Sequence, residues 1–300
     1  MNYRHAFHAG NFADVVKHVL LTLALVHLRK KEAAFRVIDS HAGTGRTNLE
    51  STEAARGGEW QGGVGRIWDT DFGPKVEPLL VPYREALRAF NPEGALKIYP
   101  GSPLLIRHFL RRQDRLIACE LESGAAQALA RNLRGDPRVK AIAIDGWTAL
   151  AAYIPPKERR GLVLIDPPYE ERDELARLAD AIATAHAKWR TGMMLAWYPI
   201  KDTREIAGFI RTLSKYKIEN SLRIELVSER GTDQGKSADD KSGNDKSDEG
   251  ESVGGLRGSG MIAVHPPFTL ADDAKILLPA LAKAFWPDLR ASVRIDNLPA

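Results

Sequence analysis

Short apolar segments alternate with helix-like segments along most of the chain, and this alternation constrains the fold more than any other feature. Apolar runs of about four to eight residues are typical of buried strands. Strands that alternate with helices form a mostly parallel sheet with helices on both faces. The helix-like segments include 103–112, 122–134 and 171–188. We expect seven strands, at 35–39, 116–120, 139–144, 162–166, 193–197, 222–227 and 261–265.

The two ends of the chain extend this α/β pattern. The last two strands leave no room for a helix of ordinary composition between them, so we expect a terminal hairpin with one antiparallel strand. Near the start, apolar residues recur on one helical face behind Asn11 and Asp14, which resemble an N-cap and a capping-box acid. We expect a helix over about 12–31, within an N-terminal arm and helix over 1–33 of a single domain over 1–300.

Two stretches interrupt the alternation. Residues 46–98 contain a Gly-rich segment, a helical segment punctuated by prolines and no good strand, so we expect a small inserted helical subdomain. Between 228 and 252, Ala238 is the only hydrophobic residue among 25. Such a segment cannot bury enough surface to offset the entropy of ordering, and we expect a disordered, acidic, Ser-rich loop over 228–254.

Cysteine content and hydropathy exclude several classes of protein. The single cysteine, Cys119, can neither form an intrachain disulfide nor supply a multi-thiolate zinc site, so we expect a cytoplasmic protein. The apolar run at 19–26 is interrupted by Thr22 and is far short of the length that spans a bilayer. No small-residue cleavage site of a secretory signal follows it. We expect no membrane partner, and a monomer.

The strongest chemical signal is an apolar strand that runs directly into Asp-Pro-Pro-Tyr at 166–169. The exocyclic amino group of a nucleobase is a poor nucleophile, because its lone pair is delocalised into the ring. Acceptors that hold its two N–H bonds favour the pyramidal geometry needed for attack on a methyl group. The Asp166 carboxylate can accept one bond and the carbonyl of Pro167, fixed by proline geometry, can accept the other. Tyr169 can stack on an extruded base.

A plain turn is the alternative interpretation of this motif, because two prolines end a strand and turns use Asp and Pro freely. It explains the prolines alone, whereas catalysis explains all four residue types. We therefore expect Asp166, Pro167 and Tyr169 to be catalytic, in a direct, in-line methyl transfer to the amino group of a base, and Asp166 also to contact the cofactor.

A second strand, at 35–39, runs into a Gly-rich turn. Gly43 and Gly45 let the backbone approach a ligand closely at the carboxyl end of a strand, where open α/β sheets bind cofactors. Taken alone, this Gly-x-Gly pattern fits a nicotinamide cofactor equally well.

Acidic residues end the next two strands. Glu120 can accept both hydroxyls of a ribose, and Asp145, followed by Gly146, is placed for an adenine amino group. The strand ends thus follow the order of an S-adenosylmethionine enzyme, whereas a dehydrogenase has no use for Asp-Pro-Pro-Tyr. The alternative is that each acid merely caps the helix that follows.

The first eleven residues are rich in aromatic and cationic side chains. They suit an RNA-facing arm in which Tyr3 stacks on a base and Arg4 reaches phosphate. The histidines have no cysteine and no apparent acidic partner, so we expect no metal. Lys17 and His18 come early in the first helix and could approach the carboxylate of the cofactor, although a solvated lysine is the alternative.

Seven motifs lie at 3–11, 14–18, 39–45, 99–103, 166–169, 197–199 and 260–261. Together they resemble the RlmJ family of 23S ribosomal RNA adenine-N6 methyltransferases. The resemblance runs from residue 1 to about 227 and resumes at about 255. The N-terminal arm and Tyr-Pro-Gly-Ser-Pro are specific to the family, whereas Asp-Pro-Pro-Tyr is shared with other amino-group methyltransferases.

This resemblance implies a class I, Rossmann-like, S-adenosylmethionine-dependent methyltransferase with a helical subdomain inserted after the first Gly-turn. It implies a catalytic acceptor at Asp166 and a substrate contact near Tyr3. The cofactor contacts that it implies are His18, His41, Ser102, Glu120, Asp145 and Gly146. The chain departs from the family at Thr44, where Ala is frequent, and at His265, where Asn-Pro-Pro is usual. The second departure leaves the role of that late motif open.

Two other functions remain open at this point. A DNA adenine-N6 methyltransferase would share the catalytic motif, but it should carry a sequence-reading domain, for which residues 46–98 look small. A non-catalytic RNA-binding module would bind no cofactor.

The net charge of +4 combines two unlike parts of the chain. Residues 228–252 hold eight acids and four bases, a net charge of −4, so the rest of the chain carries +8. Basic clusters lie at 29–31, 107–112 and 159–160. This distribution favours an RNA substrate.

Overall fold

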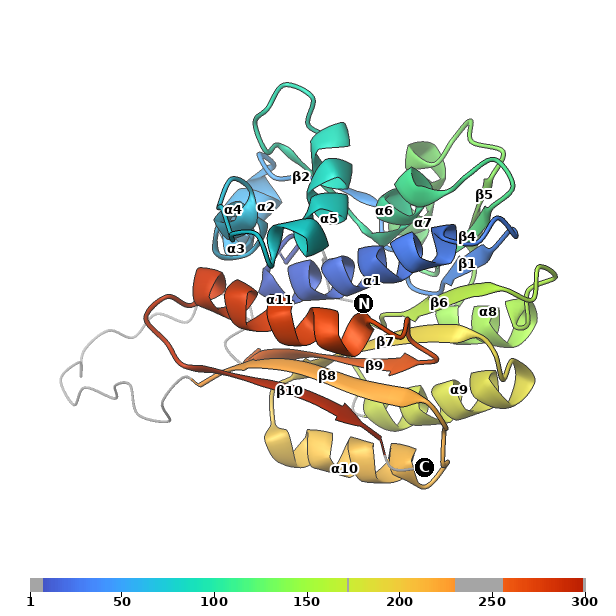
Figure 1. The fold of residues 1–300 in the computed structure, drawn as a ribbon. Coiled ribbons are helices and arrows are strands. Elements are labelled where there is room, and N and C mark those ends of the chain that lie inside the picture. Colours follow the sequence, from blue (N-terminus) through green and yellow to red (C-terminus); the bar gives the residue numbers. More distant parts are fainter. Residues whose placement is uncertain (1–7, 172, 230–255, 299–300) are drawn as a thin grey trace, which may run out of the picture.

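The computed structural model describes residues 8–171, 173–229 and 256–298, which fold around one large mixed sheet (Figure 1). Five of its strands run parallel, in the order β7-β6-β1-β4-β5. They are β1 (Arg36–Asp39), β4 (Arg115–Glu120), β5 (Val139–Ala143), β6 (Gly161–Ile165) and β7 (Met193–Ile200). Four of these five are entirely or largely buried, as expected of strands covered on both faces; β5 lies at the sheet edge.

Antiparallel strands complete the other end of the sheet. The expected hairpin is formed by β8 (Ser221–Ser228) and β9 (Gly258–Val264), and β9 also pairs antiparallel with β7. The prediction of seven strands is wrong, because β10 (Ala291–Asn297) pairs with β8 as an eighth. As an edge strand it contains only half-buried and exposed residues, so it lacks the apolar run by which the others were recognised.

Helices cover both faces of the sheet (Figure 1). One face carries α1 (Phe12–Arg29), α5 (Glu77–Ala89), α6 (Ser102–Phe109), α7 (Ser123–Asn132) and α11 (Leu270–Phe285). The other carries α8 (Gly146–Tyr153), α9 (Glu174–Lys188) and α10 (Thr203–Ser214). No described helix is both long enough and apolar enough to span a membrane.

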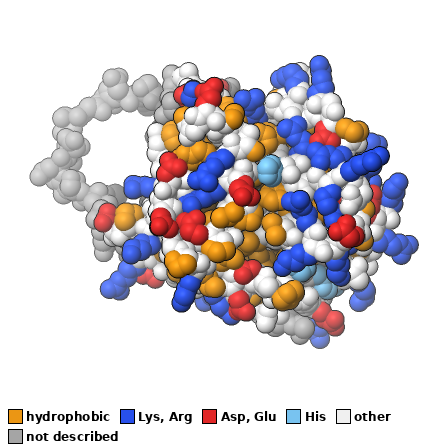
Figure 2. Space-filling view, turned by 45° about the horizontal axis from the view of Figure 1, so that its top comes forward, with side chains coloured by type: hydrophobic (Ala, Val, Ile, Leu, Met, Phe, Trp, Pro, Cys, Tyr) orange, Lys and Arg blue, Asp and Glu red, His pale blue; other side chains and the backbone are white. Residues whose placement is uncertain are grey.

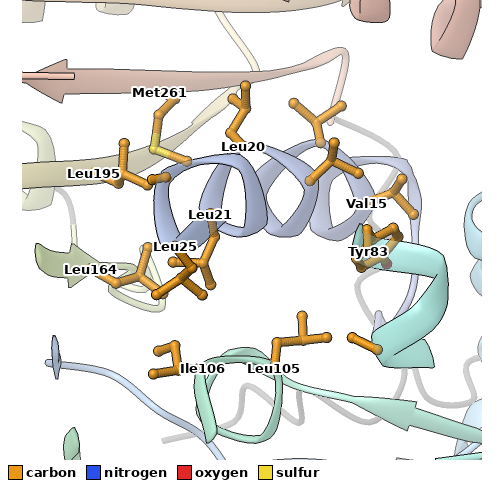
Figure 3. Packing of buried hydrophobic residues seen from close by; sticks show 14 of the residues in the cluster. Val15, Leu20, Leu21, Leu25, Tyr83, Leu105, Ile106, Leu164, Leu195 and Met261 are labelled. Carbon is orange, nitrogen blue, oxygen red and sulfur yellow. The ribbon is translucent and has the colours of Figure 1, made fainter. Parts of the chain in front are cut away.

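The first helix, α1, is buried on nearly all sides. Asn11 caps it by accepting a hydrogen bond from the backbone N–H of Asp14 (2.9 Å), as the sequence predicts. The helix ends at Arg29, two residues before the expected end. It packs against α5, α6 and α11 and against β7 and β9. Figure 3 shows Leu21 and Leu25 pointing from α1 toward α6 and β6. Burial in this central layer fixes the position of every polar group that α1 carries.

Residues 46–98 contain more than the expected helices. Besides α5, the helices are α2 (Thr52–Gly57), α3 (Glu59–Gly62) and α4 (Val64–Ile67). The expectation that no strand lies here is wrong, because β2 (Arg46–Asn48) and β3 (Ile98–Pro100) pair antiparallel at the two ends of the segment. Strands of three residues are too short for a periodic pattern. The division of the chain into a domain and a subdomain remains a prediction.

The acidic loop predicted over 228–254 lies outside the described residues, except for its first two. Of these, Ser228 is the last residue of β8, where it pairs with Ala291. The hairpin therefore extends one residue farther than the composition of the loop indicated.

Replacing Leu21 by alanine should lower the free energy of unfolding by about 2 to 5 kcal/mol, because this fully buried side chain leaves a cavity between α1 and α6. The matched control is Leu289→Ala, because the side chain of Leu289 is 43% exposed. This substitution should change the free energy of unfolding by less than about 1 kcal/mol. Equilibrium denaturation measures both. Equal effects of the two substitutions would contradict the central position of α1.

Candidate active site at the carboxyl edge of the sheet

The predicted site residues follow the carboxyl ends of parallel strands, which meet at one edge of the sheet. Strand β1 lies between β4 and β6, so the order in which strands are added reverses there. Open α/β sheets bind ligands at such a switch point, in the crevice outside the strand ends. The Gly-rich turn after β1 and Asp166 after β6 flank this point.

Asp166 forms an ion pair with Lys17 of α1, at 2.5 Å between Nζ and Oδ2. The same ammonium binds Oδ1 of Asp14 at 2.7 Å. Lys17 is only 4% exposed, so the alternative of a solvated lysine is wrong. Burial lowers the pKa of Lys17, but Asp14 and Asp166 together hold it above its ordinary value. Lys17 therefore remains a cation that joins α1 to the end of β6.

The other residues of Asp-Pro-Pro-Tyr have fixed positions. Pro167 is buried beside the half-buried Asp166. Tyr169 has a φ of +55°, which turns the chain sharply after the prolines, and its hydroxyl donates to the carbonyl of Trp197 in β7. Its ring meets the indole of Trp197 edge-on, with centroids 5.5 Å apart. The Lys17 ammonium lies 5.6 Å from the centroid of the same indole.

The Gly-rich turn is joined to the end of β4. Gly43 has a φ of +60° and donates its N–H to Oε2 of Glu120 at 2.9 Å. A Cβ built on Gly43 would meet no atom within 4 Å, so the backbone here is open to a ligand. Glu120 does not cap the helix that follows, because Glu122 is the N-cap of α7. For Glu120 the capping alternative is therefore wrong.

Asp39, at the end of β1, is completely buried beneath this turn. Its Oδ2 accepts a hydrogen bond from the Ser102 hydroxyl at 2.7 Å, whereas its Oδ1 has no partner among the described residues. Burial raises the pKa of Asp39 to about 7, against the hydrogen bond from Ser102, which lowers it. Ser102 thus binds a residue of the site, and does so from the first turn of α6.

His41 and Gly146 lie against each other on the opposite side of the turn. A Cβ on Gly146 would stand 2.4 Å from Nε2 of His41, so glycine is required for this contact. The His41 ring also meets Trp147 edge-on at 5.2 Å. Burial lowers the pKa of His41 to about 4, so the imidazole is neutral at physiological pH. Asp145 does cap α8, through the N–H of Thr148 at 2.8 Å, as the capping alternative proposed.

His18 lies one residue beyond Lys17 but is buried, 1% exposed. Its Nδ1 lies 2.7 Å from the hydroxyl of Tyr99, which in turn lies 3.1 Å from that of Tyr83. In this structure the imidazole therefore contacts the Tyr-Pro-Gly-Ser-Pro segment. The two predicted RNA contacts, Tyr3 and Arg4, lie outside the described residues.

Two residues at this edge have fuller roles than the sequence indicated. Asp14 was recognised only as a capping acid, yet it is 5% exposed and joins Lys17 to the backbone N–H of Gly10. The sequence did contain a signal for the ion pair between Asp14 and Lys17, because side chains three residues apart on a helix are neighbours. Trp197 was noted only within a motif, and no local pattern shows that it lies against Tyr169 and Lys17. Among the described residues, no group of three or more His, Cys, Asp and Glu side chains is placed to hold a metal ion.

Comparison with known families gives one match that covers most of the chain. Residues 32–239 match the family model RsmJ, described as ribosomal RNA large subunit methyltransferase D, RlmJ. Two relatives named ribosomal RNA large subunit methyltransferase J are each 36% identical to this chain. The relative from Haemophilus influenzae covers 99% of this chain and 98% of its own length. The one from Escherichia coli covers 96% and 95%.

A solved structure has the same fold over nearly the whole chain. The crystal structure of protein LPL1258 from Legionella pneumophila superimposes with a TM-score of 0.82 at 31% sequence identity. The match covers 97% of this chain and 98% of that one.

The shifted pKa values of Asp39 and His41 predict opposite effects of pH on stability. Folded Asp39 keeps its proton up to about pH 7, whereas the unfolded residue loses it near 3.8, so its contribution is lost as pH rises between these values. Folded His41 stays neutral down to about pH 4 and the unfolded residue is protonated below 6.5, so its contribution is lost as pH falls. The two trends oppose each other in the wild type.

Asp39→Asn removes only the first trend. The free energy of unfolding of this variant, relative to the wild type, should increase by roughly 2 to 4 kcal/mol between pH 4 and pH 7. Denaturation at a series of pH values measures this difference, with the exposed Asp288→Asn as the control. A difference that stays flat over this range would show that Asp39 is not held protonated.

Proposed function

The chain belongs to the RsmJ/RlmJ family of ribosomal RNA methyltransferases, and we propose that it methylates N6 of an adenine in 23S ribosomal RNA, with S-adenosylmethionine as methyl donor. The relatives' names support a ribosomal RNA substrate. The proposal that the methyl group goes to an amino group rests on the position of Asp166. This residue lies with Pro167 at the end of a fully buried strand, beside the switch point of the sheet.

The residues after β6 suit the chemistry of an adenine amino group. Its nitrogen must become pyramidal before it can form a fourth bond, and acceptors on both N–H bonds favour this change. Lys17 already binds Oδ2 of Asp166, so we assign Oδ1 to one N–H and the carbonyl of Pro167 to the other. Positive charge develops on the nitrogen during transfer, and the Asp166 carboxylate stabilises it.

Lys17 holds the catalytic carboxylate in place. A buried ammonium shared between Asp14 and Asp166 restricts the rotation of Asp166 far more than solvent would. Because Asp14 belongs to α1 and also binds the N–H of Gly10, the acceptor is tied to the end of the N-terminal arm. This arrangement fixes the direction from which N6 is held.

The turn after β1 fits the methyl donor. Gly43 leaves open space beside its backbone, and the carboxylate of Glu120 stands next to it for the ribose hydroxyls. Gly146 packs directly against His41, which it holds beside the turn, and Asp145 remains half-buried at the start of α8. When bound, S-adenosylmethionine would supply a methyl group on a sulfonium: as N6 bonds to this carbon the carbon–sulfur bond would break, S-adenosylhomocysteine would leave, and N6 would lose one proton. Because His41 is neutral, its ring adds no positive charge that would oppose the sulfonium.

The two aromatic rings beside Asp166 suit a base taken out of its stack. Tyr169 is fixed by its hydroxyl bond to the carbonyl of Trp197 and by the edge-on contact with its indole. A ring held in this way offers a flat apolar surface at little entropic cost, and stacking on it would place the adenine next to its acceptors.

Replacing Asp166 by asparagine should reduce methyl transfer to 23S RNA by at least about a hundredfold, because the charge that stabilises the developing cation is lost. Binding of S-adenosylhomocysteine, measured by thermal shift, should stay within a few-fold of the wild type. Asp288→Asn is the control. Transfer at near wild-type rates by the Asp166 variant would exclude this residue as the acceptor.

The choice of nucleic acid is tested with labelled S-adenosylmethionine and either protein-free 23S RNA or duplex DNA. We expect label in the RNA alone, because the relatives are named for ribosomal RNA. Incorporation into DNA at a comparable rate would favour a DNA methyltransferase, and failure of the chain to bind S-adenosylhomocysteine would indicate a non-catalytic RNA-binding module.

A further inference from the structure

Three segments far apart in the chain meet at the amino edge of the sheet, opposite the candidate active site. Residues 29–36 lead into β1, 111–115 into β4 and 157–160 into β6. The register explains the meeting, since Arg36 is paired with Arg115 on one side and with Gly161 on the other. We call the surface of these three segments the amino-edge surface.

This surface is strongly basic. Its 17 residues contain ten Lys and Arg side chains and three acids, a net charge of +7, whereas the whole chain carries +4. All three acids are paired with arginines: Asp114 with Arg111 at 2.9 Å, Glu158 with Arg36 at 2.8 Å, and the almost fully exposed Glu32 with Arg111 at 3.9 Å. Figure 2 shows Lys and Arg side chains gathered on the right of the molecule, the side on which α1 ends in Figure 1.

Contacts within the fold hold the cations close together. Arg111 donates to the carbonyls of Lys31 at 3.0 Å and Ala33 at 3.2 Å, and Arg160 donates to Ala33 at 2.6 Å. Both guanidinium groups lie over the ring of Phe35, 5.7 and 5.8 Å from its centroid. Burial lowers the pKa of Arg160, and the nearby charge of Arg111 lowers it further. The chain keeps these charges together despite their mutual repulsion.

Exposed cations surround these fixed arginines. Four that extend to solvent on the three segments are Lys30, Lys31, Arg112 and Lys157. Seven of the ten cations are arginines, whose planar guanidinium matches the geometry of phosphate. A polyanion with regularly spaced phosphates is the partner that such a surface fits.

We propose that the amino-edge surface is a second RNA-binding surface, which binds the phosphate backbone of the substrate RNA away from the adenine that is modified. The proposal rests on the proposed function for the identity of the RNA. The six residue-to-residue steps from Arg160 to Asp166 span about 20 Å at the rise of a strand, so this surface and the site cannot contact the same nucleotide. It therefore contributes affinity for a large, folded RNA and takes no part in methyl transfer.

The test compares two variants of the full-length chain. The edge variant carries Lys30→Gln, Lys31→Gln, Arg112→Gln and Lys157→Gln. The control variant carries the same number of neutralised, exposed cations elsewhere: Arg204→Gln, Arg211→Gln, Lys215→Gln and Lys283→Gln. Both have the same net charge, so only the position of the lost charges differs. Thermal unfolding and binding of S-adenosylhomocysteine confirm that each variant is folded and keeps its cofactor site.

Binding is measured on protein-free 23S RNA over a range of salt concentrations. Each lost phosphate contact reduces the slope of log K against log salt by about 0.7 to 0.9, so the edge variant, with four neutralised cations, should lose about 2.8 to 3.6 in slope and bind about tenfold or more weakly. Its KM for methylation of this RNA should rise with kcat unchanged. For the shortest fragment of this RNA that the wild type still methylates, KM should change less than twofold. The control variant should show smaller changes.

Equal salt slopes and KM values for the two variants would overturn the proposal, and so would an equal loss on the shortest fragment. Neither result affects the proposed function. That function fails separately if the wild type transfers no methyl group to 23S RNA.

Discussion

The parallel register of β1, β4 and β6 determines where chemistry can occur on this chain. Because these strands run in one direction, their carboxyl ends lie at one edge of the sheet. Asp39 is the last residue of β1, Glu120 is the last residue of β4, and Asp166 directly follows β6. The same pairing brings the basic segments that precede the strands to the opposite edge. One backbone constraint therefore separates the acids of the candidate active site from the proposed RNA-binding cations, and a chain in which one of these strands ran antiparallel would mix them.

Within that arrangement, the buried ion pair between Lys17 and Asp166 joins the first helix to the candidate catalytic motif. Burying a carboxylate and an ammonium costs desolvation free energy, which is offset only where both charges are fully paired. The second bond, to Asp14, completes the pairing of Lys17. Because α1 is surrounded by apolar contacts, the position of Lys17 is fixed by packing. The hydrophobic core thus determines the orientation of a group at the candidate active site.

Local patterns predicted the elements whose residues are buried on both faces, and they predicted the residues that directly follow those strands. Strand β10 was not predicted because an edge strand needs no apolar run. Strands β2 and β3 were not predicted because they are too short to show a periodic pattern. Partnerships across the fold were not predictable: the spacing of Asp14 and Lys17 is visible in the chain, but Asp166 lies 149 residues from Lys17. Only the packing of α1 across the sheet brings them together.

Addition of a methyl group to an exocyclic amino group of ribosomal RNA is tested most directly by the identity of the product. Protein-free 23S RNA is incubated with the chain and deuterium-labelled S-adenosylmethionine, digested to nucleosides and analysed by mass spectrometry. We predict that the label appears as N6-methyladenosine. Label on a ring nitrogen, a ribose hydroxyl or another base would contradict the proposed roles of Asp166 and Pro167.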